Sequence, residues 1–217
     1  GAQGANITVP YKEAVIPYLD ILSEGANIIG AVNTIVRNGD QLKGYNTNAI
    51  GIMDALADAG FDAEGTSGLV FGTGGAARAA AFILSWLRTD RVQVYGRSPD
   101  KAAVIASQFG GTTVSADQLR RNPLDVSIVV NATSVSSPDE SPNLTALVRD
   151  LELPSCELVL DLNYGRPENL WEELARRHEI RFMDGLRPLA YQARRTFALW
   201  TRLQVPPETF ISAIEEP

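Results

Sequence analysis

The residues with the clearest chemical potential lie in the glycine-rich stretch LVFGTGGAARAAAF, which begins at Leu69. Gly72, Gly74 and Ala77 follow an apolar run typical of a buried strand and open a segment typical of a helix. In this setting the first glycine allows a tight turn, the second lets the backbone approach a pyrophosphate, and the small third residue allows close helix–strand packing. The free N–H groups at the helix start would face the phosphates. A structural glycine turn is the alternative, and the strand–helix–strand context favours dinucleotide binding.

The next strand ends in VYGRSPDK, where residue type decides which dinucleotide fits. Folds that bind NAD usually place Asp or Glu here for the ribose hydroxyls. This chain has Gly96, Arg97 and Ser98, followed by Lys101, so a 2′-phosphate would meet a guanidinium instead of a carboxylate. The pattern favours NADP over NAD. The alternative is that Arg97 and Lys101 are solvated charges at a helix start.

The elements that must position these residues alternate between strands and helices. Apolar runs predict strands in GLVFG, RVQVYG, TTVS, DVSIVVNAT and ELVLDLNY. Helices are predicted at 76–87, 99–109 and 168–178, followed by a long amphipathic helix in PLAYQARRTFALWTRL and a shorter one after Pro207. Strands alternating with helices indicate a parallel sheet covered on both faces. The expected fold class is therefore α/β, with a doubly wound parallel sheet of the Rossmann type.

The first sixty residues have a different pattern. A strand is predicted at 6–9, ended by Pro10, and a helix at 11–22 that carries Lys12 near its start. The Asn38-Gly39 pair predicts the centre of a β-hairpin. Thr47 or Asn48 is expected to cap a helix that ends at Gly60. The polar segment 61–67 is a plausible domain boundary.

Composition excludes several functional classes. The net charge of −7 argues against a generally basic nucleic-acid surface, and no apolar run approaches membrane-spanning length. Cys156 is the only cysteine, which excludes an internal disulfide and favours a reducing compartment, here the cytoplasm. The acidic residues show no metal-ligand pattern, and the only histidine, His178, is expected to be a surface charge near a helix end. The tryptophans are expected to be core or interface anchors: Trp86, Trp171 and Trp200.

The opening GAQGANITVP enters a strand-like run almost at once. This abrupt start leads us to expect that upstream sequence is missing.

Eight stretches together resemble one enzyme family. They are GANITVPYKE, GAVNTI, GYNTNAIG, FGTGGAARA, GRSPDK, VVNATS, LDLNY and DGLRPLAYQA, in family order and spanning nearly the whole chain. On these motifs the chain is similar to the shikimate/quinate dehydrogenases. The resemblance implies that NADPH delivers hydride to the ketone of 3-dehydroshikimate to give shikimate, reversibly. It also implies that the absent upstream segment holds a Ser-x-Ser pair that binds the substrate carboxylate.

The resemblance also implies roles for particular residues. Lys12 is the catalytic lysine, and Asn48 stands at the position of its acid–base partner. Substrate positions are Thr8, Asn33, Asn48, Tyr164 and Gln192. Cofactor positions are Gly72, Thr73, Gly74, Gly75, Ala76, Gly96, Arg97, Ser98, Lys101, Thr133, Ser134, Leu162 and Gly185.

Physical chemistry agrees with these roles. Hydride arriving at a carbonyl carbon leaves negative charge on oxygen, which needs a nearby cation or proton donor. The Lys12 ammonium, beside apolar Val9 and Tyr11, can serve and can have its pKa lowered by burial. The amides of Asn33 and Gln192 can pair with substrate hydroxyls as donors and acceptors. Without the accompanying motifs, Lys12 would be interpreted as an ordinary surface lysine, and Asn33 and Gln192 as residues of a turn or a helix surface. For Tyr164, a place in the core is nearly as well supported as a place facing a ligand.

Four positions depart from the family pattern. The family has Asp where this chain has Asn48, and an amide cannot accept a proton. The readings left open are an engineered trap for a bound complex, a natural paralogue with altered substrate, a non-catalytic relative, and a simple helix cap. Arg187 and Pro188 stand where Gly and Met are usual beside the nicotinamide, and Ser136 replaces a common Gly. These differences favour a divergent member.

The expected architecture has two domains. Residues 1–65 form a partial α/β substrate-binding domain, 66–184 the NADP-binding domain, and 185–217 helices that return to the substrate side, with the active site in the cleft between them. The expected partners are a small-molecule substrate and no nucleic acid or membrane, and the oligomeric state is monomer or homodimer. One alternative is a regulatory homologue that holds NADP or a shikimate-like ligand without turnover. Another alternative is an NADP enzyme with the same fold and a different reaction. The matches in NITVPYK and AVNT argue against it.

Overall fold

A computed structural model describes residues 2–121 and 123–215 of the chain. The chain divides into two compact units. Unit 1 comprises Gly1–Ala59 and Arg187–Pro217, and unit 2 comprises Gly60–Leu186.

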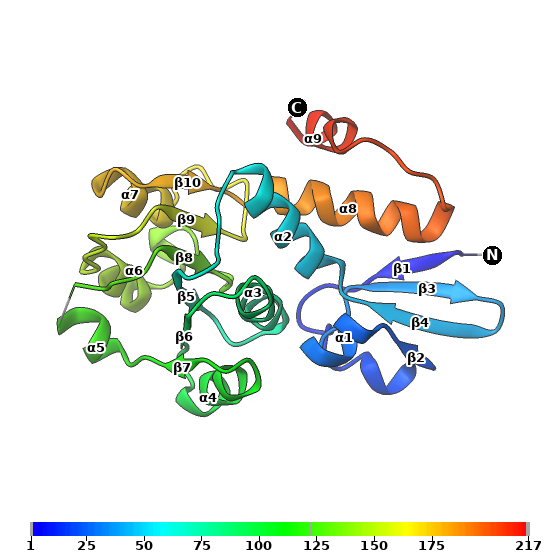
Figure 1. Ribbon diagram of the computed structural model, residues 1–217, viewed down its shortest axis with the longest axis horizontal. Helices are drawn as coiled ribbons and strands as arrows, with labels where there is room; N and C mark the ends of the chain where they lie inside the picture. Colours follow the sequence, from blue (N-terminus) through cyan, green and yellow to red (C-terminus); the bar gives the residue numbers. More distant parts are fainter. Residues whose placement is uncertain (1, 122, 216–217) are drawn as a thin grey trace. The chain divides into compact units, whose positions relative to one another are not determined.

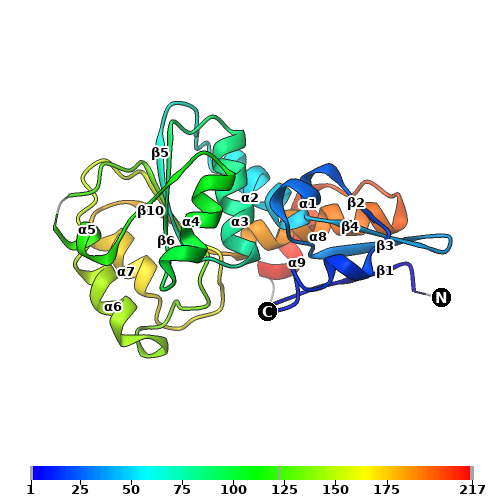
Figure 2. The same ribbon diagram turned by 90° about the horizontal axis from the view of Figure 1, so that it is seen from below.

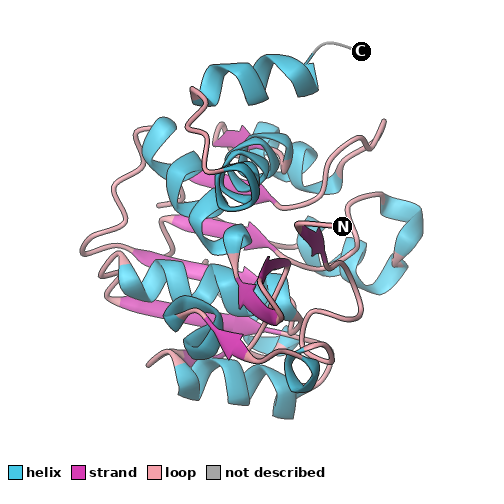
Figure 3. Ribbon diagram, turned by 90° about the vertical axis from the view of Figure 1, so that its right-hand side faces the viewer, coloured by secondary structure: helices cyan, strands magenta, loops and turns pink. Residues whose placement is uncertain are grey.

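Unit 2 is built on a six-stranded sheet in which every neighbouring pair is parallel. The strand order is β10-β9-β8-β5-β6-β7, so the first strand of the unit lies at the centre and the chain winds outward in both directions. The arrows of this sheet run side by side in one direction (Figure 3). This order is that of the doubly wound dinucleotide-binding folds, which confirms the predicted fold class. The strands are β5 (Ser67–Phe71), β6 (Arg91–Tyr95), β7 (Thr112–Thr113), β8 (Ile128–Asn131), β9 (Leu158–Asp161) and β10 (Arg181–Met183).

Helices cover both faces of this sheet (Figure 2). Gly68 of β5 faces α3, where its missing side chain leaves room for Leu84. The next residue, Leu69, packs into the core on the opposite face, because successive strand residues point to opposite sides. One face carries α3 (Gly75–Trp86) and α4 (Pro99–Gln108); the other carries α5 (Ala116–Arg121), η2 (Pro138–Glu140), α6 (Pro142–Arg149) and α7 (Leu170–Arg177).

Trp171 is the centre of the core on the second face. Its side chain is fully buried, and its ring meets Phe71 edge-on with centroids 4.8 Å apart. The indole Nε1 donates to the carbonyl of Val135 over 3.0 Å, so its one polar atom is satisfied. Trp171 is therefore a core anchor, whereas Trp86 is 67% exposed and the core reading of that residue is wrong.

Unit 1 contains a four-stranded mixed sheet in the order β1-β3-β4-β2 (Figure 1). The hairpin predicted around Asn38-Gly39 is confirmed, with Gly39 and Asp40 as the two residues between the paired strands. Gly39 has φ +63°, a conformation that glycine adopts without steric cost. The strands are β1 (Gly4–Asn6), β2 (Ile21–Leu22), β3 (Thr34–Asn38) and β4 (Gln41–Tyr45).

Two predictions for the start of unit 1 are wrong. The first strand ends at Asn6 instead of beginning there. The predicted helix over 11–22 is absent: turns lead into a single 3-10 turn, η1 (Ile16–Tyr18), and then into β2. Pro17 explains the difference, because proline inside a helix removes a backbone donor and clashes with the preceding turn. Lys12 therefore lies on a turn and not at a helix start.

The remaining helices of unit 1 are short α1 (Glu24–Ile29), α2 (Thr47–Asp58), α8 (Leu186–Thr201) and α9 (Pro207–Glu215). α2 is capped by Asn46, whose side chain accepts from the N–H of Ala49, so the cap lies one residue before the predicted pair. Gly51 of α2 lets α8 approach, since a Cβ there would lie 2.4 Å from the carbonyl oxygen of Pro188. Trp200 of α8 donates from Nε1 to the carbonyl of Ile35 in β3.

His178 differs from its expected role as a surface charge. The ring is partly buried, and Nε2 lies 2.9 Å from the carbonyl oxygen of Leu151. Because a carbonyl only accepts, this nitrogen carries the proton. His178 therefore ties the end of α7 to the loop after α6.

We expect Trp171→Ala to lower the free energy of unfolding by about 3–5 kcal/mol, because it removes a buried aromatic side chain and leaves a cavity. Trp86→Ala is the matched control and should cost less than about 1 kcal/mol, since that side chain is mostly exposed. Urea unfolding followed by circular dichroism measures both. Equal losses for the two variants would contradict the assignment of the core.

Candidate functional site

The carboxyl edge of the parallel sheet in unit 2 gathers the predicted cofactor residues. β5 and β8 are neighbours in the sheet, and the chain leaves them in opposite directions, which creates the crevice where ligands bind in such folds. Every predicted cofactor residue follows the end of a strand at this edge. Gly72–Ala76 follow β5, Gly96–Lys101 follow β6, Thr133 and Ser134 follow β8, Leu162 follows β9, and Gly185 follows β10.

The glycine turn after β5 is shaped by two different constraints. Gly72 has φ +123°, and a Cβ on it would lie 2.7 Å from the carbonyl oxygen of Ala132. This glycine is required by the fold itself. Gly74 has an ordinary φ of −96°, and a Cβ on it would meet nothing within 4 Å. It is the N-cap of α3 and offers no side-chain cap, so the first N–H groups of this twelve-residue helix stay available to a phosphate.

The segment after β6 presents cations without acidic partners. Arg97 and Lys101 are exposed, and within 2–121 and 123–215 neither forms an ion pair with a carboxylate. Ser98 is the N-cap of α4, again without a side-chain hydrogen bond to the helix. Gly96 lies against Thr73, since a Cβ on Gly96 would collide with the Thr73 methyl group. The ends of β5 and β6 are thus in contact, as a shared ligand site requires.

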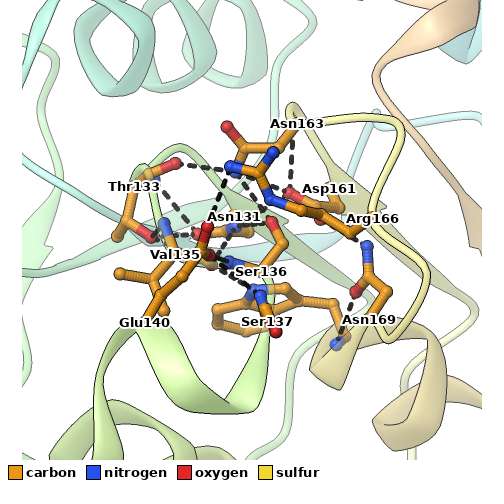
Figure 4. A network of polar contacts seen from close by, with 11 residues as sticks. Asn131, Thr133, Val135, Ser136, Ser137, Glu140, Asp161, Asn163, Arg166 and Asn169 are labelled. Carbon is orange, nitrogen blue, oxygen red and sulfur yellow. Dashed lines mark hydrogen bonds and ion pairs between the residues drawn. The ribbon is translucent and has the colours of Figure 1, made fainter.

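The ends of β8 and β9 are joined by a buried polar network centred on Asp161 (Figure 4). Asp161 has no exposed surface. Its Oδ1 accepts from Asn131 Nδ2 over 2.8 Å and from the backbone N–H of Asn163 over 3.0 Å, and its Oδ2 accepts from Asn169 Nδ2 over 2.7 Å. A buried carboxylate costs much free energy unless such donors surround it. Asp161 is therefore held by amides from three separate segments.

The same network fixes the loop that carries Thr133 and Ser134. Asn163 donates from Nδ2 to the carbonyl of Thr133 over 2.8 Å and to the hydroxyl of Ser136 over 2.9 Å. Ser136 is fully buried, so the serine that departs from the family pattern is an acceptor inside this network. The loops after β8 and β9 are consequently held together.

Glu140 closes the outer side of this loop. Its carboxylate accepts from the backbone N–H groups of Ser136 and Ser137, which lower its pKa, and it pairs with Arg166 at 2.9 Å. This carboxylate therefore stays ionised and keeps the turn closed.

In unit 1, Lys12 lies in the turn segment with its side chain partly buried. Burial lowers the pKa of its amine, in the direction expected from the sequence. The carbonyl of Lys12 accepts from the N–H of Val32 over 2.8 Å, which ties the turn to the segment before β3. Thr8, Val9 and Tyr11 are exposed, so the two apolar neighbours stand largely open to solvent.

Asn33 is buried and holds the start of α2. Its Oδ1 accepts from the N–H groups of Thr47 and Asn48 over 2.6 and 3.4 Å, and its Nδ2 donates to Thr47 Oγ1 and Asn48 Oδ1 over 2.8 and 3.1 Å. These bonds use the full capacity of one amide group. Asn33 therefore acts as a support for Asn48 in this structure. Gln192 is also buried and donates from Nε2 to Thr196 Oγ1 over 2.8 Å.

Two further positions are clarified by the structure. Arg187, one of the departures, forms an ion pair with Asp58 at the end of α2, within unit 1. Its charge is therefore neutralised by this chain. Tyr164 is 46% exposed after β9, which excludes the core reading and leaves its side chain free to meet a ligand.

Sequence reasoning missed the supporting residues. The sequence did not identify Asp161, the asparagines that donate to it, or Thr34 and Thr196, and it suggested Thr47 only as a possible helix cap. A signal existed in part, since VVNATS and LDLNY place polar residues directly at strand ends. The supporting residues that the structure adds are Thr34, Thr47, Asn131, Asp161, Asn163, Asn169 and Thr196.

The described residues offer little support for a metal site, a membrane span or a reactive cysteine. Within the described ranges, no three His, Cys, Asp or Glu side chains gather closely enough to hold a metal ion, and no helix is both long and apolar enough to cross a membrane. Burial raises the pKa of the Cys156 thiol to about 11, so it stays protonated and unreactive at neutral pH.

The parallel sheet, its strand order and the glycine turn define a Rossmann-type α/β protein. A family model described as the shikimate dehydrogenase substrate binding domain matches residues 1–35. The chain is 38% identical to the shikimate dehydrogenase (NADP(+)) of Moorella thermoacetica, covering 95% of this chain and 72% of that protein. It is 35% identical to the enzyme of the same name from Halothermothrix orenii, covering 99% and 76%. The chain therefore belongs to the shikimate dehydrogenase family.

A solved structure supports the same assignment. Shikimate 5-dehydrogenase from Thermus thermophilus, in complex with NADP(H) and shikimate, superposes with a TM-score of 0.84 and 34% sequence identity. The match covers 98% of this chain and 78% of that chain.

We expect Asp161→Asn to lower the free energy of unfolding by about 1–3 kcal/mol, because one of its oxygens would become a donor that faces other donors. Amide hydrogen exchange should rise at Thr133 and Asn163 together, since the two loops lose their common acceptor. Asp125→Asn is the control, as its carboxylate is 82% exposed and should matter by less than about 0.5 kcal/mol. Unchanged exchange in the Asp161 variant would show that the network does not hold the loops.

Proposed function

We propose that this protein is an NADP-dependent shikimate dehydrogenase that reduces 3-dehydroshikimate to shikimate and catalyses the reverse oxidation. Family membership supports the reaction. The structural observation that carries the proposal is the glycine turn at the open start of α3, at the edge of the parallel sheet where two strands separate. Unit 2 would bind NADP through Gly72–Ala76 and Gly96–Lys101, with Thr133, Ser134, Leu162 and Gly185 on the nicotinamide side.

Unit 1 would supply the proton chemistry. When bound, the nicotinamide cofactor supplies the hydride that adds to the ketone carbon. The Lys12 ammonium donates the proton that the ketone oxygen takes up, which completes the alcohol. Because burial lowers the pKa of Lys12, its ammonium is a stronger acid than that of a solvated lysine and its amine is more readily available for the reverse step. Thr8, Asn48, Tyr164 and Gln192 would contact the substrate. Asn33, predicted as a substrate residue, would instead act by supporting Asn48, because its amide is fully used within unit 1.

We also propose that the protein works in the cytoplasm on small molecules, as a monomer or homodimer. Its single cysteine, Cys156, is free and only partly exposed, which supports a reducing compartment.

Asn48 supports a second candidate function, that of a homologue that binds NADP or a shikimate-like ligand without turnover. An amide at this position cannot take up a proton, whereas general acid–base groups typically contribute about 10²–10⁴-fold to a rate.

We expect Asn48→Asp to raise kcat/KM for 3-dehydroshikimate by about 10²-fold, because a carboxylate restores a proton acceptor near the ligand. NADPH oxidation measured by absorbance tests this in the purified protein and the variant. Asn27→Asp, which adds the same charge at an exposed position of α1, should leave the rate unchanged. Equal, substantial rates in the parent and Asn48→Asp would identify a tolerant enzyme. Silence in both, with NADPH still bound, would favour the regulatory homologue.

The exposed guanidinium after β6 predicts a preference for NADPH over NADH. Arg97→Ala should reduce the ratio of kcat/KM for the two cofactors by about 10–100-fold, the contribution of about 1.5–3 kcal/mol from charged hydrogen bonds to a phosphate. Arg149→Ala removes an exposed guanidinium from α6 and is the control. If the parent used NADH and NADPH equally, the cofactor assignment would be wrong.

A further inference from the structure

Three threonine hydroxyls form a closed ring inside unit 1. Thr34 Oγ1 lies 2.9 Å from Thr47 Oγ1, and Thr196 Oγ1 lies 3.0 Å from each of them. The residues come from β3, α2 and α8, and their exposed fractions are only 0%, 1% and 2%. The ring is thus a buried junction of three elements that are distant in sequence.

Each hydroxyl of the ring also meets one side-chain amide. Asn6 Nδ2 lies 3.1 Å from Thr34 Oγ1, and Asn33 Nδ2 and Gln192 Nε2 each lie 2.8 Å from the hydroxyls of Thr47 and Thr196. The ring therefore has three hydroxyl–hydroxyl hydrogen bonds, which form its edges, and three hydrogen bonds to amides outside it.

The supply of hydrogen atoms determines the direction of every contact. A hydroxyl carries one hydrogen and two lone pairs, so three hydroxyls have just enough hydrogens for three ring edges. None remains to donate to the amides. All three amides must therefore turn their NH₂ groups toward the ring. The backbone agrees at two of them: Asn6 also donates to the carbonyl of Asn33, and Oδ1 of Asn33 accepts from the N–H of Thr47.

The orientation of Asn33 in turn determines the orientation of the Asn48 side chain. The second hydrogen of Asn33 Nδ2 donates to Asn48 Oδ1 over 3.1 Å, so the oxygen of Asn48 is turned toward Asn33. Its Nδ2 then points the other way. Among the residues that the structure describes, this nitrogen has no hydrogen-bond partner and is not a buried unsatisfied atom, so it reaches the surface. The same argument leaves the Oε1 of Gln192 as an open acceptor.

We propose that the threonine ring fixes Asn48 as a hydrogen-bond donor toward the ligand, which makes position 48 selective for a ligand oxygen that accepts. Such an oxygen is a keto group or a hydroxyl that uses its lone pair; a donor-only group such as an ammonium is disfavoured. A carboxylate at position 48 would have the opposite preference. Thr34, Thr47 and Thr196 are then positioning residues. The proposal deepens the proposed function and rests on it for the choice of ligands.

The first test compares analogues of shikimate in which each ring hydroxyl in turn is replaced by a keto oxygen or by an ammonium, with binding measured by calorimetry. At one ring position the parent should bind the keto analogue at least about tenfold more tightly than the ammonium analogue, the size of about one hydrogen bond. Asn48→Asp should reverse this order at that position. Unchanged order in the variant, or an ammonium preference in the parent, would overturn the proposal.

The second test opens the ring. Thr196→Val removes one hydroxyl at nearly constant volume, and the keto-over-ammonium preference should weaken, because Asn33 then loses the constraint from the ring and keeps only the one from the backbone N–H of Thr47. Thr196→Ser keeps the hydroxyl and should retain the preference. NADP binding, which depends on unit 2, should be the same in both variants, and the thermal unfolding of each variant reports whether unit 1 remains folded. A retained preference in Thr196→Val would show that the ring does not set the direction.

A third measurement separates failure of this proposal from failure of the proposed function. If the parent binds no shikimate analogue, the function is wrong, but the direction of the amide can still be measured by nuclear magnetic resonance. The side-chain NH₂ of Asn33 should exchange slowly with solvent and that of Asn48 quickly. The reverse pattern would overturn the inference.

Discussion

The constraint on which this structure depends is that a buried polar group must find a partner. Leaving one unpaired costs about 1–3 kcal/mol, a large fraction of the total stability of a protein domain. Both units place polar side chains in their interiors, and both satisfy them almost completely. Asp161 accepts from three asparagines and a backbone N–H in unit 2, and three threonines and three amides satisfy one another in unit 1. Each network joins segments that carry candidate ligand-binding residues.

The two networks have different roles because they join different kinds of backbone segments. In unit 2 the parallel strands bring loops together at one edge, and Asp161 links the loops that follow β8 and β9. A charged hub suits this task because it accepts several hydrogen bonds at once. In unit 1 a helix and a hairpin meet α8, and neutral hydroxyls set the direction of amides. Neutral groups avoid the large cost of burying a charge.

The local pattern of apolar and polar residues predicts much of the fold, but it does not predict the buried polar residues that hold the candidate site in place. Apolar runs located β5 to β9 of the six strands in unit 2 and missed only the edge strand β10, and the predicted helix at 99–109 is α4 (Pro99–Gln108). The helix predicted at 11–22 from its apolar spacing does not form, because Pro17 interrupts the backbone hydrogen bonds that it would need. Thr34 and Thr47 lie in the quoted motifs GAVNTI and GYNTNAIG, but nothing in the local sequence indicates that their hydroxyls meet that of Thr196. Their contacts join residues up to 162 positions apart, which only the folded chain brings together.

The ring also explains how the fold can accept Asn at position 48. Asn33 supplies a donor that needs one acceptor, and either Asn or Asp offers an oxygen there. Packing and hydrogen bonding inside unit 1 therefore constrain one of the two terminal atoms of this side chain and leave the other free. That second atom is the one that faces outward, and it is a donor in Asn and an acceptor in ionised Asp. A substitution that is nearly silent for folding thus changes the chemistry offered to the ligand, because stability and recognition depend on opposite ends of the same group.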